Sequence, residues 1–104
     1  MATDKVSSRD WRHPGGKLRD AGADTLSDRE LLAILISSGI KGKSAEAVAS
    51  DILARFGSFR GMANQPLDKL MSIRGLGPVK TTRIAAAFEI ARRIVLDVIR
   101  EQQE

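Results

Sequence analysis

The chain has 104 residues, 17 of them Lys or Arg and 13 Asp or Glu, and its sequence pI is about 10.0. With no cysteine and a single histidine, a disulfide framework and a thiolate metal site are excluded, and a zinc centre is not expected. The longest apolar run, Leu31 to Ile36, is far shorter than the ~20 residues of a membrane helix, and the polar N-terminus does not resemble a secretion signal. We therefore expect one soluble domain in the cytoplasm, with no membrane partner.

The basic charge is concentrated in two windows. Residues 1–96 hold 16 basic and 10 acidic groups, a net charge of +6. Residues 31–45 contain two lysines and no acid, and residues 69–88 contain four cations and no acid. Both windows surround glycines. Such a surface suits nucleic acid, although many helical proteins of similar pI bind none.

The first 20 residues have no apolar period, so an irregular arm with room for one helical turn is expected there. Ser27 followed by Glu30 is a capping-box pattern, in which each side chain accepts from the other's backbone amide. The apolar run 31–36 follows directly. A short, central and buried helix is predicted from residue 28.

A glycine-containing loop over residues 38–43 separates this helix from a second one, for which Ser44 is the predicted N-cap. An outer pair of opposite charge, Asp51 and Arg55, has helical spacing, and Gly57 is a typical helix end. The apolar positions repeat with the period of one buried helix face: Ala45, Val48, Ala49, Ile52, Leu53 and Phe56.

A short connecting helix is expected over residues 58–63, and a third principal helix over residues 66–72, starting at Pro66. Pro78 opens a long fourth helix, whose outer face carries Glu89, Arg93 and Asp97 at ion-pair spacing. Its inner stripe spans about four turns: Ile84, Ala87, Phe88, Ala91, Val95 and Val98.

No segment alternates with the period of a strand, so the predicted fold class is all-α. The order is helix, glycine hairpin, helix, connector, helix, glycine hairpin, helix. One helix pair cannot bury its apolar face alone, so two such units packed together form the smallest core. We expect a tandem helix-hairpin-helix domain over residues 21–100 and the start of a linker over 101–104.

The strongest motif lies between the third and fourth helices, where Gly75 and Gly77 allow a sharp reversal and a close approach of a ligand to the main chain. The helix that begins at Pro78 has first-turn amides without internal partners, at the positive end of its dipole. Phosphate suits that surface, and three nearby cations would reinforce it: Arg74, Lys80 and Arg83. The alternative is that this segment is only a tight turn between two helices and binds no ligand.

Together with Leu70, Ile73 and Leu76, this segment resembles the helix-hairpin-helix motif of sequence-independent DNA-binding proteins. The resemblance implies phosphate contacts from backbone amides: those of Gly75, Gly77, Val79 and Lys80. It also implies a monovalent cation, Na⁺ or K⁺, held by backbone carbonyls: those of Met71, Ile73 and Leu76. No other cofactor is expected.

The first hairpin is a looser match, with one more residue between its glycines, Gly39 and Gly42, and no proline. Two roles remain open for it. It could bind a second phosphate through Lys41 and Lys43, across the groove from the second hairpin, or it could be a degenerate structural partner.

Several separated segments of the sequence, taken in order, resemble the N-terminal region of the bacterial RadC family, whose members are described as DNA repair proteins. They include residues 26–35 and four short motifs: SG at 38–39, GKS at 42–44, FGS at 56–58 and IRGLGP at 73–78. The usual family phrase has arginine and glutamate around its proline, where this chain has His13-Pro14-Gly15-Gly16-Lys17. Family members continue into a metallopeptidase-like JAMM/MPN domain, which the 104 residues do not contain.

Two functions fit these observations. The first is a non-catalytic, sequence-independent module that binds the DNA backbone, with branched or distorted duplex as a candidate target. The second is a protein-docking or dimerisation module with degenerate hairpins. Enzymatic activity is not expected, because no metal or nucleophile constellation is present. Trp11, flanked by Arg9, Arg12 and His13, fits either stacking on a base or packing on the core.

Overall fold

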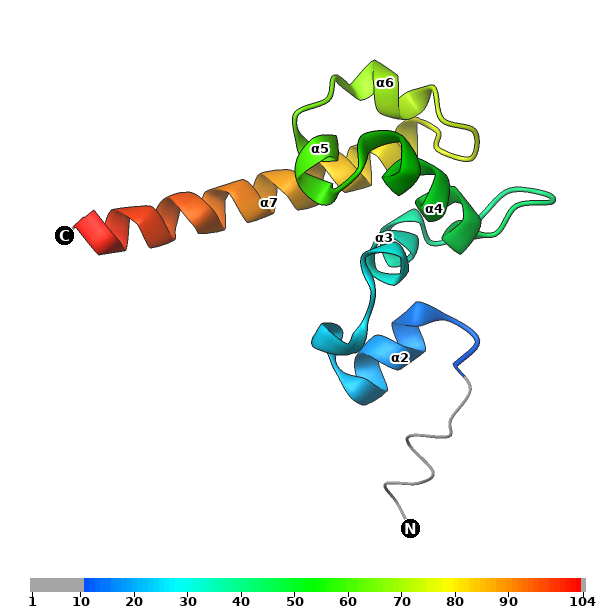
Figure 1. Cartoon of the computed structure of the whole chain (residues 1–104), viewed down its shortest axis with the longest axis horizontal. Coiled ribbons are helices and arrows are strands. Elements are labelled where there is room, and N and C mark those ends of the chain that lie inside the picture. The colour runs from blue at the N-terminus through cyan, green and yellow to red at the C-terminus, as the bar shows by residue number, and fades with distance from the viewer. Residues whose placement is uncertain (1–10, 104) are drawn as a thin grey trace, which may run out of the picture.

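The computed structural model describes residues 11–103, which fold into six α-helices and one short 3-10 helix with no strand. Figure 1 shows their arrangement. The elements are α2 (Pro14–Ala21), η1 (Ala23–Thr25), α3 (Asp28–Ile36), α4 (Ala45–Phe56), α5 (Phe59–Ala63), α6 (Leu67–Met71) and α7 (Pro78–Gln103). The predicted all-α class is confirmed.

The expectation of an irregular arm is wrong for residues 14–21, which form helix α2. Pro14 occupies the start of this helix, and Gly22, with φ of 98°, ends it by donating its amide to the Leu18 carbonyl. The salt bridge from Lys17 to Glu30 of α3, at 3.1 Å, ties α2 to the body, which offsets the low helix propensity of the two glycines in its first turn. Residues 1–10 of the expected arm lie outside the described residues.

Helices α3 and α4 form the first predicted unit. The capping box at Ser27 is present, with the Glu30 amide donating to Ser27 Oγ and the Ser27 amide to Glu30 Oε1. Helix α4 begins after Ser44 and ends before Gly57, which has φ of 83°. Both helices bury the faces that their apolar periods indicated.

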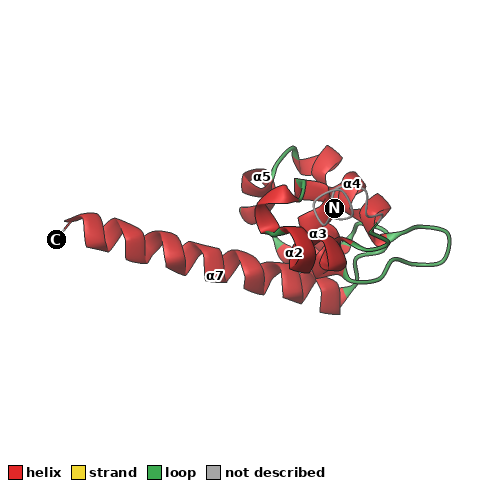
Figure 2. Ribbon diagram, turned by 90° about the horizontal axis from the view of Figure 1, so that it is seen from below, coloured by secondary structure: helices red, strands yellow, loops and turns green. Residues whose placement is uncertain are grey.

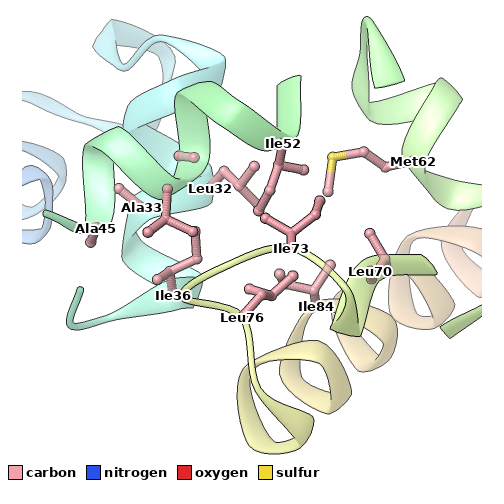
Figure 3. Packing of buried hydrophobic residues seen from close by; sticks show 12 residues of the cluster. Leu32, Ala33, Ile36, Ala45, Ile52, Met62, Leu70, Ile73, Leu76 and Ile84 are labelled. Carbon is pink, nitrogen blue, oxygen red and sulfur yellow. The ribbon is translucent and has the colours of Figure 1, made fainter. Parts of the chain in front are cut away.

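The second unit closes the core against the first. Ile73 and Leu76 of the hairpin point into the same cluster as Ile36 of α3 and Ile84 of α7 (Figure 3). Leu76 is 2% exposed, so it fills the inward position that the sequence suggested. The hairpin backbone is therefore held by its own apolar side chains, while Gly75 is half-buried and Gly77 is exposed.

Helix α7 leaves the body and projects as a single helix (Figures 1 and 2). Its predicted buried stripe holds only for its first part, because Val95 and Val98 are 55% and 45% exposed. The helix also continues through the expected linker as far as Gln103. Glu89 pairs with Arg93, as predicted, and with Arg92. No described helix combines the length and hydropathy needed to cross a bilayer.

Candidate nucleic-acid interface

The second hairpin, residues 73–77, depends on its two glycines in different ways. Gly75 has φ of 96°, and a Cβ there would lie 2.7 Å from Val48 Cγ2, so the hairpin packs directly on α4. Gly77 has no positive φ, and a Cβ there would meet nothing within 4 Å. The expected reversal is thus made at Gly75 alone, while Gly77 leaves open space beside the main chain.

The backbone amides of this hairpin divide into used and unused donors. Leu76 donates to the Ile73 carbonyl and Thr81 to the Gly77 carbonyl, each at 3.0 Å. The amides that the motif assigns to phosphate have no hydrogen-bond partner among the described residues: Gly75, Gly77, Val79 and Lys80. They lie at the start of the 26-residue helix α7, whose first turn carries no acidic residue. Such a group of donors is suited to an anion.

The three cations predicted to reinforce these amides do not behave alike. Lys80 Nζ donates to the Ser38 carbonyl, and Arg83 Nη1 donates to the Leu35 carbonyl at 3.1 Å. Leu35 lies in the last turn of α3 and Ser38 two residues beyond its end, where the helix dipole favours positive charge. Arg74 is exposed and makes no ion pair within residues 11–103. Lys80 and Arg83 therefore also hold the two units together, whereas Arg74 is free to meet a ligand.

The first hairpin has a different backbone. Ile40 and Lys43 exchange two hydrogen bonds of 2.9 Å, which places Lys41 and Gly42 at the tip of a two-residue turn. Gly42 has φ of 82°, and a Cβ on Gly39 would lie 2.0 Å from the Lys43 carbonyl oxygen. Lys43 forms an ion pair with Asp51, which replaces the predicted Asp51–Arg55 pair. Of the two predicted cations in this hairpin, only Lys41 is unpaired within the described chain.

The helix that follows the first hairpin is capped by its own sequence. Ser44 Oγ accepts from the Ala47 amide at 3.1 Å, so this amide is unavailable to an external anion. Glu46 adds a negative charge in the same turn. Of the two roles left open for this hairpin, these contacts favour the structural one.

The proposed cation ligands are backbone carbonyls around the second hairpin. The Ile73 carbonyl already accepts from Leu76, while those of Met71 and Leu76 accept no backbone hydrogen bond from the described residues. A Na⁺ or K⁺ ion at these oxygens stays a prediction. Within residues 11–103, no group of three or more His, Cys, Asp or Glu side chains is placed to hold a metal ion.

Comparison with known proteins places the chain in a family. Residues 8–82 match the family model described as UPF0758 N-terminal. The chain belongs to this family. The UPF0758 N-terminal domain is the N-terminal region of the RadC family, so the resemblance seen in the sequence is confirmed.

The relatives of the chain include UPF0758 proteins from several bacteria. It is 43% identical to one from Stutzerimonas stutzeri, over 91% of the chain and 44% of the relative. It is 42% identical to one from Shewanella loihica, over 86% and 41%, and 44% identical to one from Desulforudis audaxviator, over 77% and 35%. The chain thus spans less than half the length of these relatives. No solved structure matches it.

Proposed function

We propose that this domain binds the DNA backbone without sequence preference, and that the second hairpin makes the principal contact. The observation that carries the proposal is a set of unpartnered amides beside the free guanidinium of Arg74: those of Gly75, Gly77, Val79 and Lys80. Amides at a helix start hold a phosphate oxygen by hydrogen bonds, and they read no base edge. The expected mode is therefore independent of sequence.

The strength of binding follows from the number of phosphates involved. One or two phosphates neutralised at the second hairpin correspond to a log–log salt slope of about −1 to −2. An engaged first hairpin would bring the slope to about −4. Affinity at physiological salt should be micromolar or weaker, which suits a module that acts as part of a longer protein.

In such a longer protein, this module would serve as the non-catalytic DNA-binding part of a RadC-like DNA repair protein in the bacterial cytoplasm. The JAMM/MPN domain implied by the family resemblance would then be brought to DNA by the second hairpin. A monovalent cation at the carbonyls of Met71, Ile73 and Leu76 would support the hairpin in that contact.

The sharpest test is Gly77→Ser. Ser44 shows how a serine at a helix cap accepts from the amide three residues ahead, so the introduced hydroxyl would accept from the Lys80 amide and withdraw it from an external anion. Stability should rise by a few tenths of a kcal/mol, while DNA binding falls. Fluorescence anisotropy with a labelled duplex measures affinity, and thermal unfolding measures stability.

Arg74→Ala is the companion variant, because the side chain is exposed and unpaired within the described residues. It should flatten the salt slope by about one without a change in stability. Unchanged duplex affinity in both variants would contradict the proposal, because a folding defect cannot account for that result.

A protein-docking function is the second candidate, and the exposed apolar half of α7 favours it. Ile90, Ile94 and Val95 are each more than half exposed on this projecting helix. Under the docking function, Arg74→Ala should leave self-association or partner binding intact, while Ile94→Lys should reduce it. Sedimentation velocity on both variants over a range of protein concentrations separates the two functions.

A further inference from the structure

A polar cavity of about 290 Å³ lies on another part of the molecule, between the segment before α2 and the first turns of α3 and α4. Its walls include the Trp11 ring, several cations and two carboxylates: Arg12, Lys17, Arg29, Glu30 and Glu46. A second cavity of about 190 Å³ shares His13, Pro14 and Glu46 with it, so the hollow continues between the start of α2 and the C-terminal part of α3. The phosphate contact proposed above makes no use of these residues.

Trp11 does not belong to the hydrophobic core. Its indole Nε1 donates to Asp20 Oδ2 at 3.1 Å, and its Cδ1 would lie 3.5 Å from a Cβ built on Gly16. The ring is therefore positioned against α2, is only half-buried, and borders the cavity. An aromatic ring held in this way can stack on a planar ligand.

The charged groups around the cavity are of two kinds. Lys17 and Glu30 satisfy one another, and the Ser27 amide together with Lys17 lowers the pKa of Glu30, so this pair contributes little net charge. Arg12, Arg29 and Glu46 make no ion pair or hydrogen bond within residues 11–103. The cavity thus combines free guanidinium groups and a free carboxylate with an aromatic ring.

We propose that this cavity binds one unstacked nucleotide of a DNA strand. The base stacks on Trp11, its edge donates N–H groups to the Glu46 carboxylate, and Arg12 and Arg29 bind the phosphate. The inference rests on the proposed function, since it assigns to the same domain a second DNA contact of a different kind. Guanine should bind best, because its Watson–Crick edge presents two adjacent N–H donors to a carboxylate.

Simpler ligands suit the cavity less well. Inorganic phosphate would meet the guanidinium groups but would also face the Glu46 carboxylate. An apolar ligand would leave these charges without partners, which is costly when they are desolvated. A nucleotide satisfies both charges and covers the ring. Because a base must leave the stack to enter, the cavity would direct the domain to unpaired or distorted DNA.

The test uses Trp11, which is the single tryptophan of the chain and gives one indole N–H signal in NMR spectra. The whole chain is titrated with each of the four deoxynucleoside monophosphates and with inorganic phosphate. The indole signal should shift with the nucleotides, at the lowest concentration with dGMP, and should not shift with phosphate. Glu46→Gln should weaken dGMP binding about tenfold, whereas Arg29→Ala should weaken all four nucleotides by a similar factor.

The outcomes separate the two proposals. Hairpin amides that respond to duplex DNA, with an indole signal silent to all nucleotides, would overturn the nucleotide site alone. An indole signal that responds to dGMP, with silent hairpin amides, would overturn the hairpin contact and retain the cavity. Equal shifts with phosphate and with nucleotides would reduce the cavity to an anion site and would refute base binding.

Discussion

The two hairpins occupy equivalent places in the fold, yet only the second leaves its following helix open to an anion. The first is followed by Ser44, which takes the Ala47 amide, and by Glu46. The second ends at Gly77, which has no side chain to accept from the Lys80 amide, and the first turn of the helix after it carries no acidic residue. A helix start therefore becomes an anion site only when its own cap residue does not satisfy it.

The hairpins also differ in what their cations do. Lys43 of the first is neutralised by Asp51 of α4. Lys80 and Arg83 of the second unit reach the carbonyls of Ser38 and Leu35, at the end of the helix that leads into the first hairpin. These contacts link the second unit to the segment that leads into the first hairpin. The two units therefore stabilise each other, although only the second hairpin has open amides.

The largest effect is expected at Gly39. An alanine Cβ would lie 2.0 Å from the Lys43 carbonyl oxygen and 2.6 Å from the Ser44 carbonyl carbon, so the backbone of the first hairpin must move. Gly39→Ala should cost more than about 3 kcal/mol of unfolding free energy, at the upper end of overpacking effects.

Gly42→Ala is the matched control for Gly39→Ala, because its Cβ would meet nothing within 4 Å and only its φ of 82° is unfavourable. It should cost about 1–2 kcal/mol. Urea unfolding followed by circular dichroism measures both variants. Equal losses of unfolding free energy in the two variants would mean that the close contact at Gly39 does not determine the conformation of the first hairpin.

The next substitution, at Thr81, should raise the stability of the fold instead of lowering it. This residue follows its helix cap by four positions, as Val48 does in the first unit, and both are fully buried. Thr81 Oγ1 has no hydrogen-bond partner among the described residues. Thr81→Val should therefore stabilise the fold by about 1–2 kcal/mol, because it removes an unsatisfied polar atom.

Thr82→Val provides the comparison for that substitution. Its hydroxyl is exposed and donates to the Pro78 carbonyl at 2.7 Å, so its loss should be neutral or slightly destabilising. Differential scanning calorimetry at one protein concentration compares the two melting temperatures. A destabilised Thr81→Val variant would indicate that the Thr81 hydroxyl has a partner in solution.

Local signals in the sequence predicted the helices because caps and apolar periods are encoded within a few residues. The Ser27 capping box, the Ser44 cap and the Gly57 helix end are such signals, and all are present. Helix α2 was missed because its two glycines oppose helix formation and its support from Glu30 is tertiary. The contacts of Lys80 and Arg83 were missed for the same reason, since their acceptors lie 42 and 48 residues away in the chain.

The cations of the second unit should give a smaller effect. Lys80→Ala and Arg83→Ala each remove a positive charge from the C-terminal end of α3 and should cost about 0.3–1 kcal/mol of stability. Arg74→Ala removes the same charge from the hairpin without a contact, so stability should not change. Chemical denaturation gives these values. If Arg74→Ala were as costly as the other two, the division between supporting and free cations would be wrong.

The smallest loss of stability, and the most direct comparison of the hairpins, is expected for Ser44→Gly. Loss of the hydroxyl frees the Ala47 amide and should cost only a few tenths of a kcal/mol, since glycine is itself a tolerated cap. An open amide alone should not create a second phosphate site, because Glu46 in the same turn still repels the anion. The salt slope of duplex binding should therefore match that of the unmodified chain. The double variant Ser44→Gly with Glu46→Gln removes both the capping hydroxyl and the negative charge from the start of α4, and the slope should steepen by about one. If the single variant steepened the slope to the same extent, the cap alone would distinguish the two hairpins, and the acidic first turn of α4 would have no part in the difference.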